Sequence, residues 1–406
     1  MIMAKKFEKS FTLQEPIPEE AISRAIEVMR SGRLHRYNSD PGEISETSKL
    51  EKDFAGFQGA SYCLAVASGG QALQIALRAA GVSTGTKVLA NAYTLAPVPG
   101  AIHAAGGEPV FIEIGDDWHT DIADLEEKAN SSGAKFFMLS HMRGHVADMD
   151  EICRICNKLG ILIIEDCAHT MGAKWKGKRS GNFGAIACFS TQTYKHLNSG
   201  EGGLLTTNDK EIAARATMLS GSYMLHSRHG AGPPPDTYKT ISLQTPNCSA
   251  RMDNLRAAIL HVQLATLSEN IQRWNERYKI LEHGLGMAPG IKIVERKQHE
   301  EFVGSSIQFH TTGIDKDLIP KLVENCRARG VEIKWFGADE PDGFTSRYDS
   351  WHYLGNQQHL PQTLKALSTT CDMRIPLTFT QADCRDIAGI IAEETTALIA
   401  VTTRVS

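Results

Sequence analysis

The sequence predicts an α/β protein whose main sheet is largely parallel and covered by helices on both faces. Seven short apolar runs recur between about residues 48 and 250, with helical patterns between several of them. These runs are apolar throughout rather than alternating, as is typical of strands buried on both faces of a sheet. The rhythm then changes to a mixture of helices and strands, which predicts a smaller C-terminal α+β domain. We therefore expect an N-terminal arm and helix over 1–47, a large domain over 48–250, and a long helix with a small domain over 251–406.

The elements can be placed in order along the chain. After a short arm, PEEAISRAIEVMRSG predicts a helix, with Pro18 near its start and Gly32 at its end, the positions that these two residues favour. The seven predicted strands are SYCLAVAS, TKVLAN, EPVFIEI, AKFFMLS, ILIIED, AIACFST and GLLTTN. Helical patterns such as GGQALQIALRAAG and MDEICRICNKLG follow several of them, which predicts the crossover connections of a parallel sheet.

The second half of the chain differs in character. A polar stretch rich in Gly and Pro, SYMLHSRHGAGPPPDTYKTISLQTPN, follows helical KEIAARATMLSG. A loop of this length is usually functional or docked on a partner subunit. A long helical region is expected over about 251–285. Strand-like SSIQFHTTG, helical DLIPKLVENCRARG and a last helix, QADCRDIAGIIAEETTALIAV, complete the predicted C-terminal domain.

Composition argues against several classes of protein. The 406 residues are 42% hydrophobic and carry a formal net charge of −4 at pH 7, so no basic patch favours nucleic-acid binding. No apolar run approaches the length of a membrane span, and the N-terminus lacks the hydrophobic region of a signal peptide. The histidines near the candidate site (His141, His145, His169 and His196) form no compact metal motif by their spacing. We expect a cytoplasmic enzyme without a bound metal.

The strongest chemical signal lies in residues 165–203. Asp166 closes the apolar run ILIIED, and Lys195 follows about thirty residues later, between another strand and the glycine turn GEGG. A carboxylate at a strand end can pair with the ring nitrogen of pyridoxal phosphate (PLP), and a lysine on a neighbouring strand can form a Schiff base with it. Taken alone, Asp166 could be a helix N-cap and Lys195 a surface lysine. Together they predict a PLP site.

A phosphate site is predicted beside them. Ser68, Gly69 and Gly70 stand between a predicted strand and a predicted helix, where backbone amides and the helix dipole can bind an anion. Such a turn can occur in any strand–helix unit. Ser190, five residues before Lys195, could add a hydroxyl group or be an ordinary strand residue.

The chain resembles the DegT/DnrJ/EryC1/StrS family of sugar aminotransferases, which are fold type I PLP enzymes. The matching segments are SGGQAL, HMRGHVADMDEI, EDCAHTMGAKWKGKRSGNFGAIACFS, TYKHLNSGEGG and ARMDNLRAAILHVQL. The resemblance implies a homodimer with a seven-stranded, mostly parallel sheet. It implies that Lys195 forms the Schiff base and moves protons, Asp166 keeps the ring nitrogen charged, and His169 touches the ring hydroxyl. Ser190 and the Ser68–Gly70 loop would hold the phosphate.

The resemblance also implies the reaction. An amino group would pass from L-glutamate or L-glutamine to a keto or aldehydo sugar, sugar acid or cyclitol, in amino-sugar biosynthesis. Two positions depart from the family pattern. NAYTLAP places Leu95, with Tyr93 two residues earlier, where an aromatic residue usually stacks on the ring. Ser249 stands where an Asn usually reaches the phosphate of the neighbouring subunit, and Asn247 is displaced by two residues.

The substrate-binding residues are less well defined by the sequence. Arg228 and His229, in the 222–247 loop, are candidates for a substrate carboxylate or hydroxyls, or else solvated loop residues. The C-terminal segment that is usual in the family is replaced here by KWFGADEPDGFTSRYDSWHY. This difference affects the prediction of the acceptor substrate more than that of the cofactor. Retention of Lys195 argues against the family's sugar 3-dehydratases. An aromatising enzyme similar to aminohydroxybenzoate synthase, or a PLP-binding regulatory protein without turnover, remains as an alternative.

Overall fold

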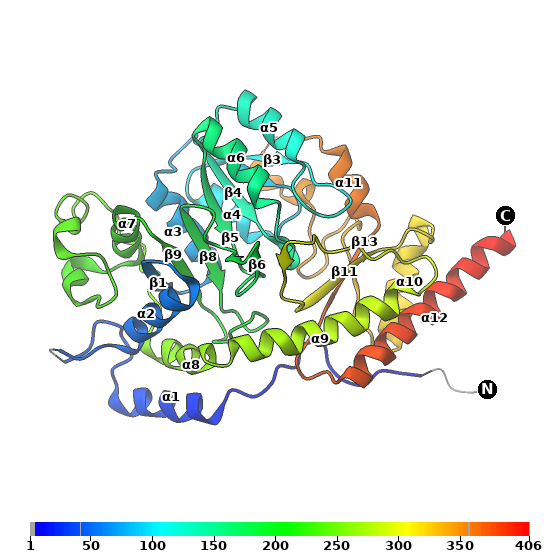
Figure 1. Cartoon of the computed structure of the whole chain (residues 1–406), viewed down its shortest axis with the longest axis horizontal. Coiled ribbons are helices and arrows are strands. Elements are labelled where there is room, and N and C mark those ends of the chain that lie inside the picture. The colour runs from blue at the N-terminus through cyan, green and yellow to red at the C-terminus, as the bar shows by residue number, and fades with distance from the viewer. Residues whose placement is uncertain (1–4, 41, 356–357, 406) are drawn as a thin grey trace.

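The computed structural model describes residues 5–40, 42–355 and 358–405 and is built around a seven-stranded sheet (Figure 1). Its strands lie in the order β1 (Tyr62–Val66), β9 (Gly203–Thr207), β8 (Ile186–Ser190), β5 (Leu162–Asp166), β4 (Phe136–Ser140), β2 (Lys87–Asn91) and β3 (Glu108–Ile112). The four pairings from β8 to β3 are parallel, whereas β9 is antiparallel to both β1 and β8. Each strand falls within one predicted run, so the mostly parallel sheet is confirmed.

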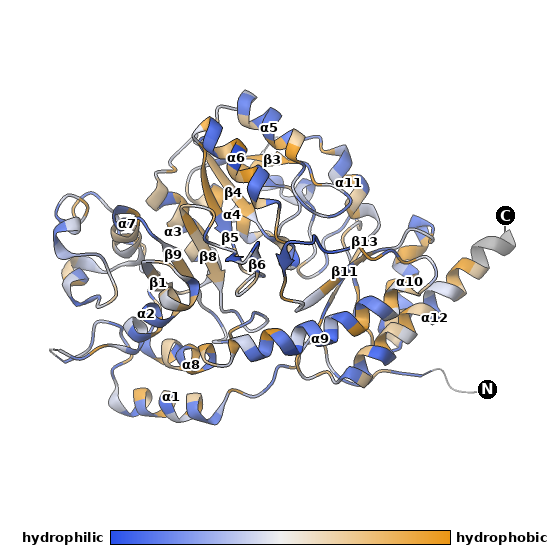
Figure 2. Cartoon of the chain, viewed as in Figure 1, coloured by the Kyte–Doolittle hydropathy of each residue, from blue (hydrophilic) through white to orange (hydrophobic). Residues whose placement is uncertain are grey.

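Helices cover both faces of this sheet. They are α2 (Glu46–Gln58), α3 (Gly69–Ala80), α4 (Pro97–Ala104), α5 (Ile122–Ser131), α6 (Met149–Leu159) and α7 (Lys210–Ser220). Successive strand residues point to opposite faces: Ile164 packs in the core cluster with α3 and α4, and Ile163 in the cluster with α5 and α6. Burial on both faces accounts for the hydrophobic colour of the central strands in Figure 2.

The N-terminal helix and the long helical region lie together. α1 (Glu19–Ser31) begins after Pro18 and ends at Gly32, whose φ of 66° favours glycine. It packs along α8 (Asn254–Leu264), below the sheet in Figure 1. The predicted long helical region is two helices, because the chain breaks after α8 and continues as α9 (Leu267–Gly286).

The C-terminal part has its own antiparallel sheet, with β13 (Thr370–Arg374) between β11 (Ser306–His310) and β12 (Lys334–Trp335). It shares a core cluster with α9, α10 (Ile319–Ala328) and α12 (Gln381–Val405). Phe7 and Phe11, from the N-terminal arm, pack edge-on against Phe379 in this core, at 5.1 and 4.9 Å between ring centroids. The three-part division of the chain stays a prediction.

The remaining elements are short. They are α11 (Pro361–Ser368), the strands β6 (Lys174–Trp175), β7 (Lys178–Arg179) and β10 (Glu300–Glu301), which form a small sheet, and the 3₁₀ turns η1 (Met142–Gly144), η2 (Tyr223–Arg228), η3 (Pro235–Tyr238), η4 (Lys316–Leu318), η5 (Tyr348–Ser350) and η6 (His352–Leu354). None of the helices over the described residues combines the length and the apolar character needed to cross a bilayer.

Candidate active site

The candidate site lies at the carboxyl ends of β4, β5 and β8, the edge at which open α/β sheets bind ligands. A cavity of about 440 Å³ opens there, and a smaller one of about 80 Å³ adjoins it. Gly69, His169, Ser190 and Lys195 line both. The two cavities therefore form one continuous site that includes most of the predicted cofactor residues.

Lys195 lies in the turn after β8, with its Nζ 2.7 Å from Nε2 of His169. Burial lowers the pKa of Lys195 to about 7, helped by the positive charges of Arg143 and Arg374 and opposed by Asp166. Burial and the charge of Lys195 in turn hold the pKa of His169 well below its ordinary value. The site thus has a lysine amine that is substantially neutral near pH 7, beside a neutral imidazole.

Asp166 is the last residue of β5 and is 7% exposed. Its Oδ2 accepts a hydrogen bond from Ser140 Oγ at 2.9 Å, and its Oδ1 accepts one from the Ala168 amide at 3.1 Å. The carboxylate borders the smaller cavity together with Lys195. It is therefore a fixed negative charge at the base of the site.

The predicted phosphate loop forms the N-terminus of α3. Ser68 caps this helix, its Oγ accepting a hydrogen bond from the Gln71 amide at 3.2 Å. A Cβ at Gly69 would lie 2.8 Å from Cβ of Ser190, so no side chain fits between the loop and β8. Gly70 continues the loop along both cavities. Free amides at a helix N-terminus, beside a buried serine, suit a phosphate group.

The structure separates the two residues considered for ring stacking. Leu95 borders both cavities. Tyr93 is 1% exposed and packs edge-on against Phe336, at 5.2 Å, inside a core cluster against which Leu95 also packs. Leu95 is therefore the residue of the pair that reaches the site.

The loop candidates Arg228 and His229 do not line this chain's cavity. Arg228 is exposed. His229 is 1% exposed, with Nδ1 bonded to the Tyr37 hydroxyl at 3.0 Å and Nε2 3.3 Å from Oε2 of Glu51. Both ring nitrogens therefore have partners within the chain. A substrate role for either residue stays a prediction.

Asn247 and Ser249 also lie outside the cavity-lining residues. Both are exposed, and Asn247 Oδ1 accepts a hydrogen bond from the Ser249 amide at 2.9 Å. An exposed position is compatible with the predicted contact to a neighbouring subunit, which stays a prediction.

Sequence reasoning missed two arginines in the larger cavity. Arg143, in η1 after β4, places Nη2 2.8 Å from Oδ2 of Asp372. Arg374, at the end of β13, lies over the ring of Tyr194 at 3.8 Å. Arg143 falls within HMRGHVADMDEI, but nothing in that segment shows which distant element its side chain will meet.

The irregular segment before α11 forms part of the cavity wall. Gly343, Phe344 and Ser346 line the larger cavity, and Phe344 is 51% exposed. These residues belong to the stretch that departs from the family pattern. The departure thus lies where a substrate would contact the protein.

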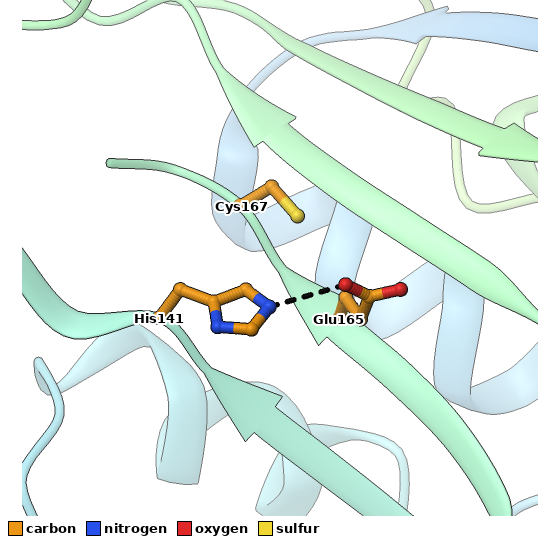
Figure 3. A group of neighbouring side chains, drawn as sticks. All are labelled: His141, Glu165 and Cys167. Atoms are coloured by element: carbon orange, nitrogen blue, oxygen red, sulfur yellow. Dashed lines mark hydrogen bonds and ion pairs between the residues drawn. The ribbon is translucent and has the colours of Figure 1, made fainter. Parts of the chain in front are cut away.

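Behind the site, His141 lies close to Glu165 and Cys167, although the spacing of the histidines predicted no metal motif (Figure 3). His141 Nε2 is 3.1 Å from Oε2 of Glu165. The same carboxylate accepts hydrogen bonds of 2.6–2.8 Å from the amides of residues 181, 183 and 184. Burial alone would raise the pKa of Glu165, but His141 and these amides lower it. The carboxylate is thus already satisfied, and the group fixes the backbone next to Asp166.

A partly buried lysine and a fixed carboxylate, with the N-terminus of a helix beside the same cavities as a phosphate site, define a PLP-dependent transferase of the α/β type. The amine, the carboxylate and the helix N-terminus match the aldehyde, ring nitrogen and phosphate of the cofactor, and the close approach at Gly69 leaves that end of the site open. The residues therefore fit PLP.

Residues 16–392 match the model of the DegT/DnrJ/EryC1/StrS aminotransferase family, and the chain belongs to this family. The predicted resemblance is confirmed. 3-Amino-5-hydroxybenzoate synthase of Amycolatopsis mediterranei is 31% identical over 266 residues, which are 66% of this chain and 65% of that enzyme. The chain thus spans slightly less than two thirds of that relative. dTDP-3-amino-3,4,6-trideoxy-α-D-glucose transaminase of Streptomyces venezuelae is 32% identical over 378 residues, 87% of this chain and 92% of that enzyme.

Solved structures show the same fold. DesV of Streptomyces venezuelae matches with a TM-score of 0.77 at 26% identity, covering 93% of this chain and 94% of that one. The PLP form of Spr1654 from Streptococcus pneumoniae matches with a TM-score of 0.79 at 17% identity, covering 97% and 99%. The predicted fold type I architecture is confirmed, and PLP is the cofactor of the family, as predicted.

Proposed function

We propose that the protein is a PLP-dependent aminotransferase that moves an amino group from L-glutamate or L-glutamine to the carbonyl of a sugar, sugar acid or cyclitol. The observation that carries this proposal is the group formed by Lys195, His169 and Asp166 beside the N-terminus of α3. The names of the two relatives above support amino transfer in the synthesis of amino sugars or related amino-substituted rings.

The cofactor residues have separate roles. Ser190 and the Ser68–Gly70 loop would hold the phosphate, Asp166 the ring nitrogen, and Leu95 one face of the ring. When bound, PLP supplies an electron sink for the carbon that loses its proton. Asp166 contributes a charge whose position is held by Ser140 and the Ala168 amide.

Lys195 moves the proton. Its neutral amine would accept the proton removed from the α-carbon of the bound donor and, as an ammonium group, return it to the former aldehyde carbon of the cofactor. The second half of the reaction would run the same two transfers in reverse. Because its pKa is lowered to about 7, a neutral fraction is present at physiological pH. His169, 2.7 Å away, orients the amine.

The homodimer is part of the proposal. Tyr223, Met224 and Leu243, in the long loop, are 54%, 57% and 87% exposed, and Met29 on α1 is 53% exposed. Such side chains favour burial against a partner. The loop residues Arg228, Asn247 and Ser249 would then approach the partner's site. Light scattering coupled to size-exclusion chromatography should give twice the monomer mass, and a monomer at micromolar concentration would contradict this part of the proposal.

The first experiment is an absorption spectrum of the purified protein, followed by addition of L-glutamate and, separately, L-glutamine. We expect a visible cofactor band that bleaches with one of these donors. A band whose absorbance does not change with either donor would favour an aromatising enzyme or a regulatory protein without turnover. No band after addition of PLP would refute the cofactor assignment for this chain.

A further inference from the structure

The larger cavity has more positive than negative charge. Besides Lys195, it is lined by Arg143 and Arg374, and Lys334 lies close enough for the charge of Arg374 to add to burial in lowering its pKa. Glu201 is the acidic residue among the lining residues; it is exposed and forms no ion pair with either arginine in the described structure. The cavity is therefore built for an anion.

Arg143 is held in an unusual position. It is 6% exposed, and its backbone has φ 55° and ψ 24°, a left-handed conformation that residues other than glycine rarely adopt. Its Nη2 forms the ion pair with Asp372, yet neither Nε nor Nη2 has a hydrogen-bond partner among the described residues. Both atoms are shielded from solvent, but the guanidinium lines the larger cavity and so adds its positive charge to the cavity wall.

The position of Asp372 is fixed from behind. Its Oδ1 accepts a hydrogen bond from Gln308 Nε2 at 2.7 Å, and Gln308 Oε1 lies 2.8 Å from Nε2 of His145. All three residues are buried. Asp372 thus holds one side of Arg143 and leaves the other side for a ligand.

Arg374 approaches from the C-terminal sheet. Its guanidinium lies over the ring of Tyr194 at 3.8 Å and forms no ion pair within the part of the chain that the structure describes. Burial and the charge of Arg143 lower the pKa of Arg374, and Asp372 only partly opposes this, so the two arginines lie close enough to repel each other. An anion placed there would relieve this repulsion.

We propose that Arg143 and Arg374 form a carboxylate subsite, so that the acceptor is a keto sugar acid or another ring ketone that bears a carboxylate. The planar fork of a guanidinium binds a carboxylate through two parallel hydrogen bonds. A neutral sugar would leave the charge of Arg374 without an anionic partner in the cavity. The inference rests on the proposed function, because it names the acceptor class of that same site.

The direct test measures binding to the PLP-loaded protein by titration calorimetry. The probes are 3-hydroxybenzoate and its neutral isostere 3-hydroxybenzamide, neither of which can accept an amino group. We expect the acid to bind the wild type at least roughly tenfold more tightly than the amide. Arg374→Gln should reduce this preference to about twofold or less. The matched control, Arg154→Gln, removes an exposed arginine on α6 that pairs with Glu151 and should keep the preference.

A second variant tests the role of the buried Arg143. Arg143→Gln leaves Asp372 unpaired and can destabilise the fold, whereas Arg143→Lys keeps the charge and loses the fork. We expect Arg143→Lys to retain the fold by circular dichroism and to lose most of the preference for the acid. Equal binding of acid and amide by the wild type, or an unchanged preference in both Arg374→Gln and Arg143→Lys, would overturn the proposal.

The amino donor also has a carboxylate, and the same variants distinguish binding of the donor's carboxylate from binding of the acceptor's. The rate at which L-glutamate bleaches the cofactor band is measured in the wild type and in Arg374→Gln. Loss of the acid preference, with or without a slower donor step, supports the acceptor subsite. A slower donor step with the acid preference intact would show that the pair serves the donor alone and would refute the inference. A wild type that binds the acid through these arginines yet transfers no amino group would refute the proposed function and leave the subsite standing.

Discussion

Replacing Arg36 by methionine tests a buried ion pair that joins the N-terminal segment to the sheet. Arg36 Nη1 and Nη2 lie 2.7 and 2.8 Å from the two carboxylate oxygens of Glu51, and the side chains are 1% and 0% exposed. Glu51 Oε1 also accepts a hydrogen bond of 2.8 Å from the Ala65 amide in β1, the strand that leads into the phosphate loop. Arg36→Met has similar length but no charge, so Glu51 would remain buried without its main partner.

The structure gives the size of the effect. Burial alone would raise the pKa of Glu51, but Arg36 and then His229 lower it from 4.5 to about 2. At roughly 1.4 kcal/mol per pH unit, this difference corresponds to about 3 kcal/mol of stability at neutral pH. Removing one partner of a buried pair typically costs about 3–5 kcal/mol. We expect Arg36→Met to lower the free energy of unfolding by about 3–4 kcal/mol at neutral pH.

The assay is urea unfolding followed by circular dichroism at several pH values. A carboxyl group with a lowered folded pKa stabilises the fold above its unfolded pKa, and this contribution is lost as the pH falls from 4.5 toward about 2. The difference between wild type and Arg36→Met should therefore shrink as the pH falls through this range. Arg33→Met, which removes an exposed arginine paired with Asp40 and Glu43, is the control and should unfold nearly as the wild type does. Equal stabilities of wild type and Arg36→Met at neutral pH, or a difference that is the same at every pH, would refute the reasoning.

Four further outcomes concern the site. Lys195→Ala should abolish amino transfer and the covalent link to the cofactor, seen as loss of the visible band; a band that persists would assign the link to another residue. Asp166→Asn keeps the shape of the side chain without its charge, so turnover should fall at least roughly tenfold while a PLP titration still saturates. Gly69→Ala would place a Cβ 2.8 Å from Cβ of Ser190, so its PLP affinity should fall in the same titration, whereas Gly56→Ala, with nothing within 4 Å, should bind PLP as the wild type does. Because the pKa of Lys195 is lowered to about 7, the single-turnover rate with donor should rise with pH through that value and then level off; a rate that falls there would exclude the amine as the base.

The sheet could be predicted because its strands are buried on both faces, which leaves continuous apolar runs in the sequence. Asp166 and Lys195 could be predicted because they stand at the ends of two such runs, and the topology brings those ends to one edge. The pairing of the two cavity arginines could not be predicted from the sequence. Arg143 lies in η1 after the large sheet's β4 and Arg374 ends β13 of the C-terminal sheet, so nothing in the sequence shows that the fold brings them to one cavity.

The same limit applies to His229. Its position in a polar loop suggested a substrate-binding residue or a solvated one, but its ring is buried and contacts Glu51 and Tyr37. A contact between distant segments leaves no periodic pattern in the sequence, whereas burial of a strand does.

The packing of Phe7 and Phe11 against Phe379 joins segments that lie far apart in the sequence. At roughly 5–20 residues per second, a ribosome would take roughly 20 to 70 s to extend the chain from Phe11 to Phe379. During that interval Phe7 and Phe11 lack their native partner. The core that they share with Phe379 can therefore form only after the segment around Phe379 has been made.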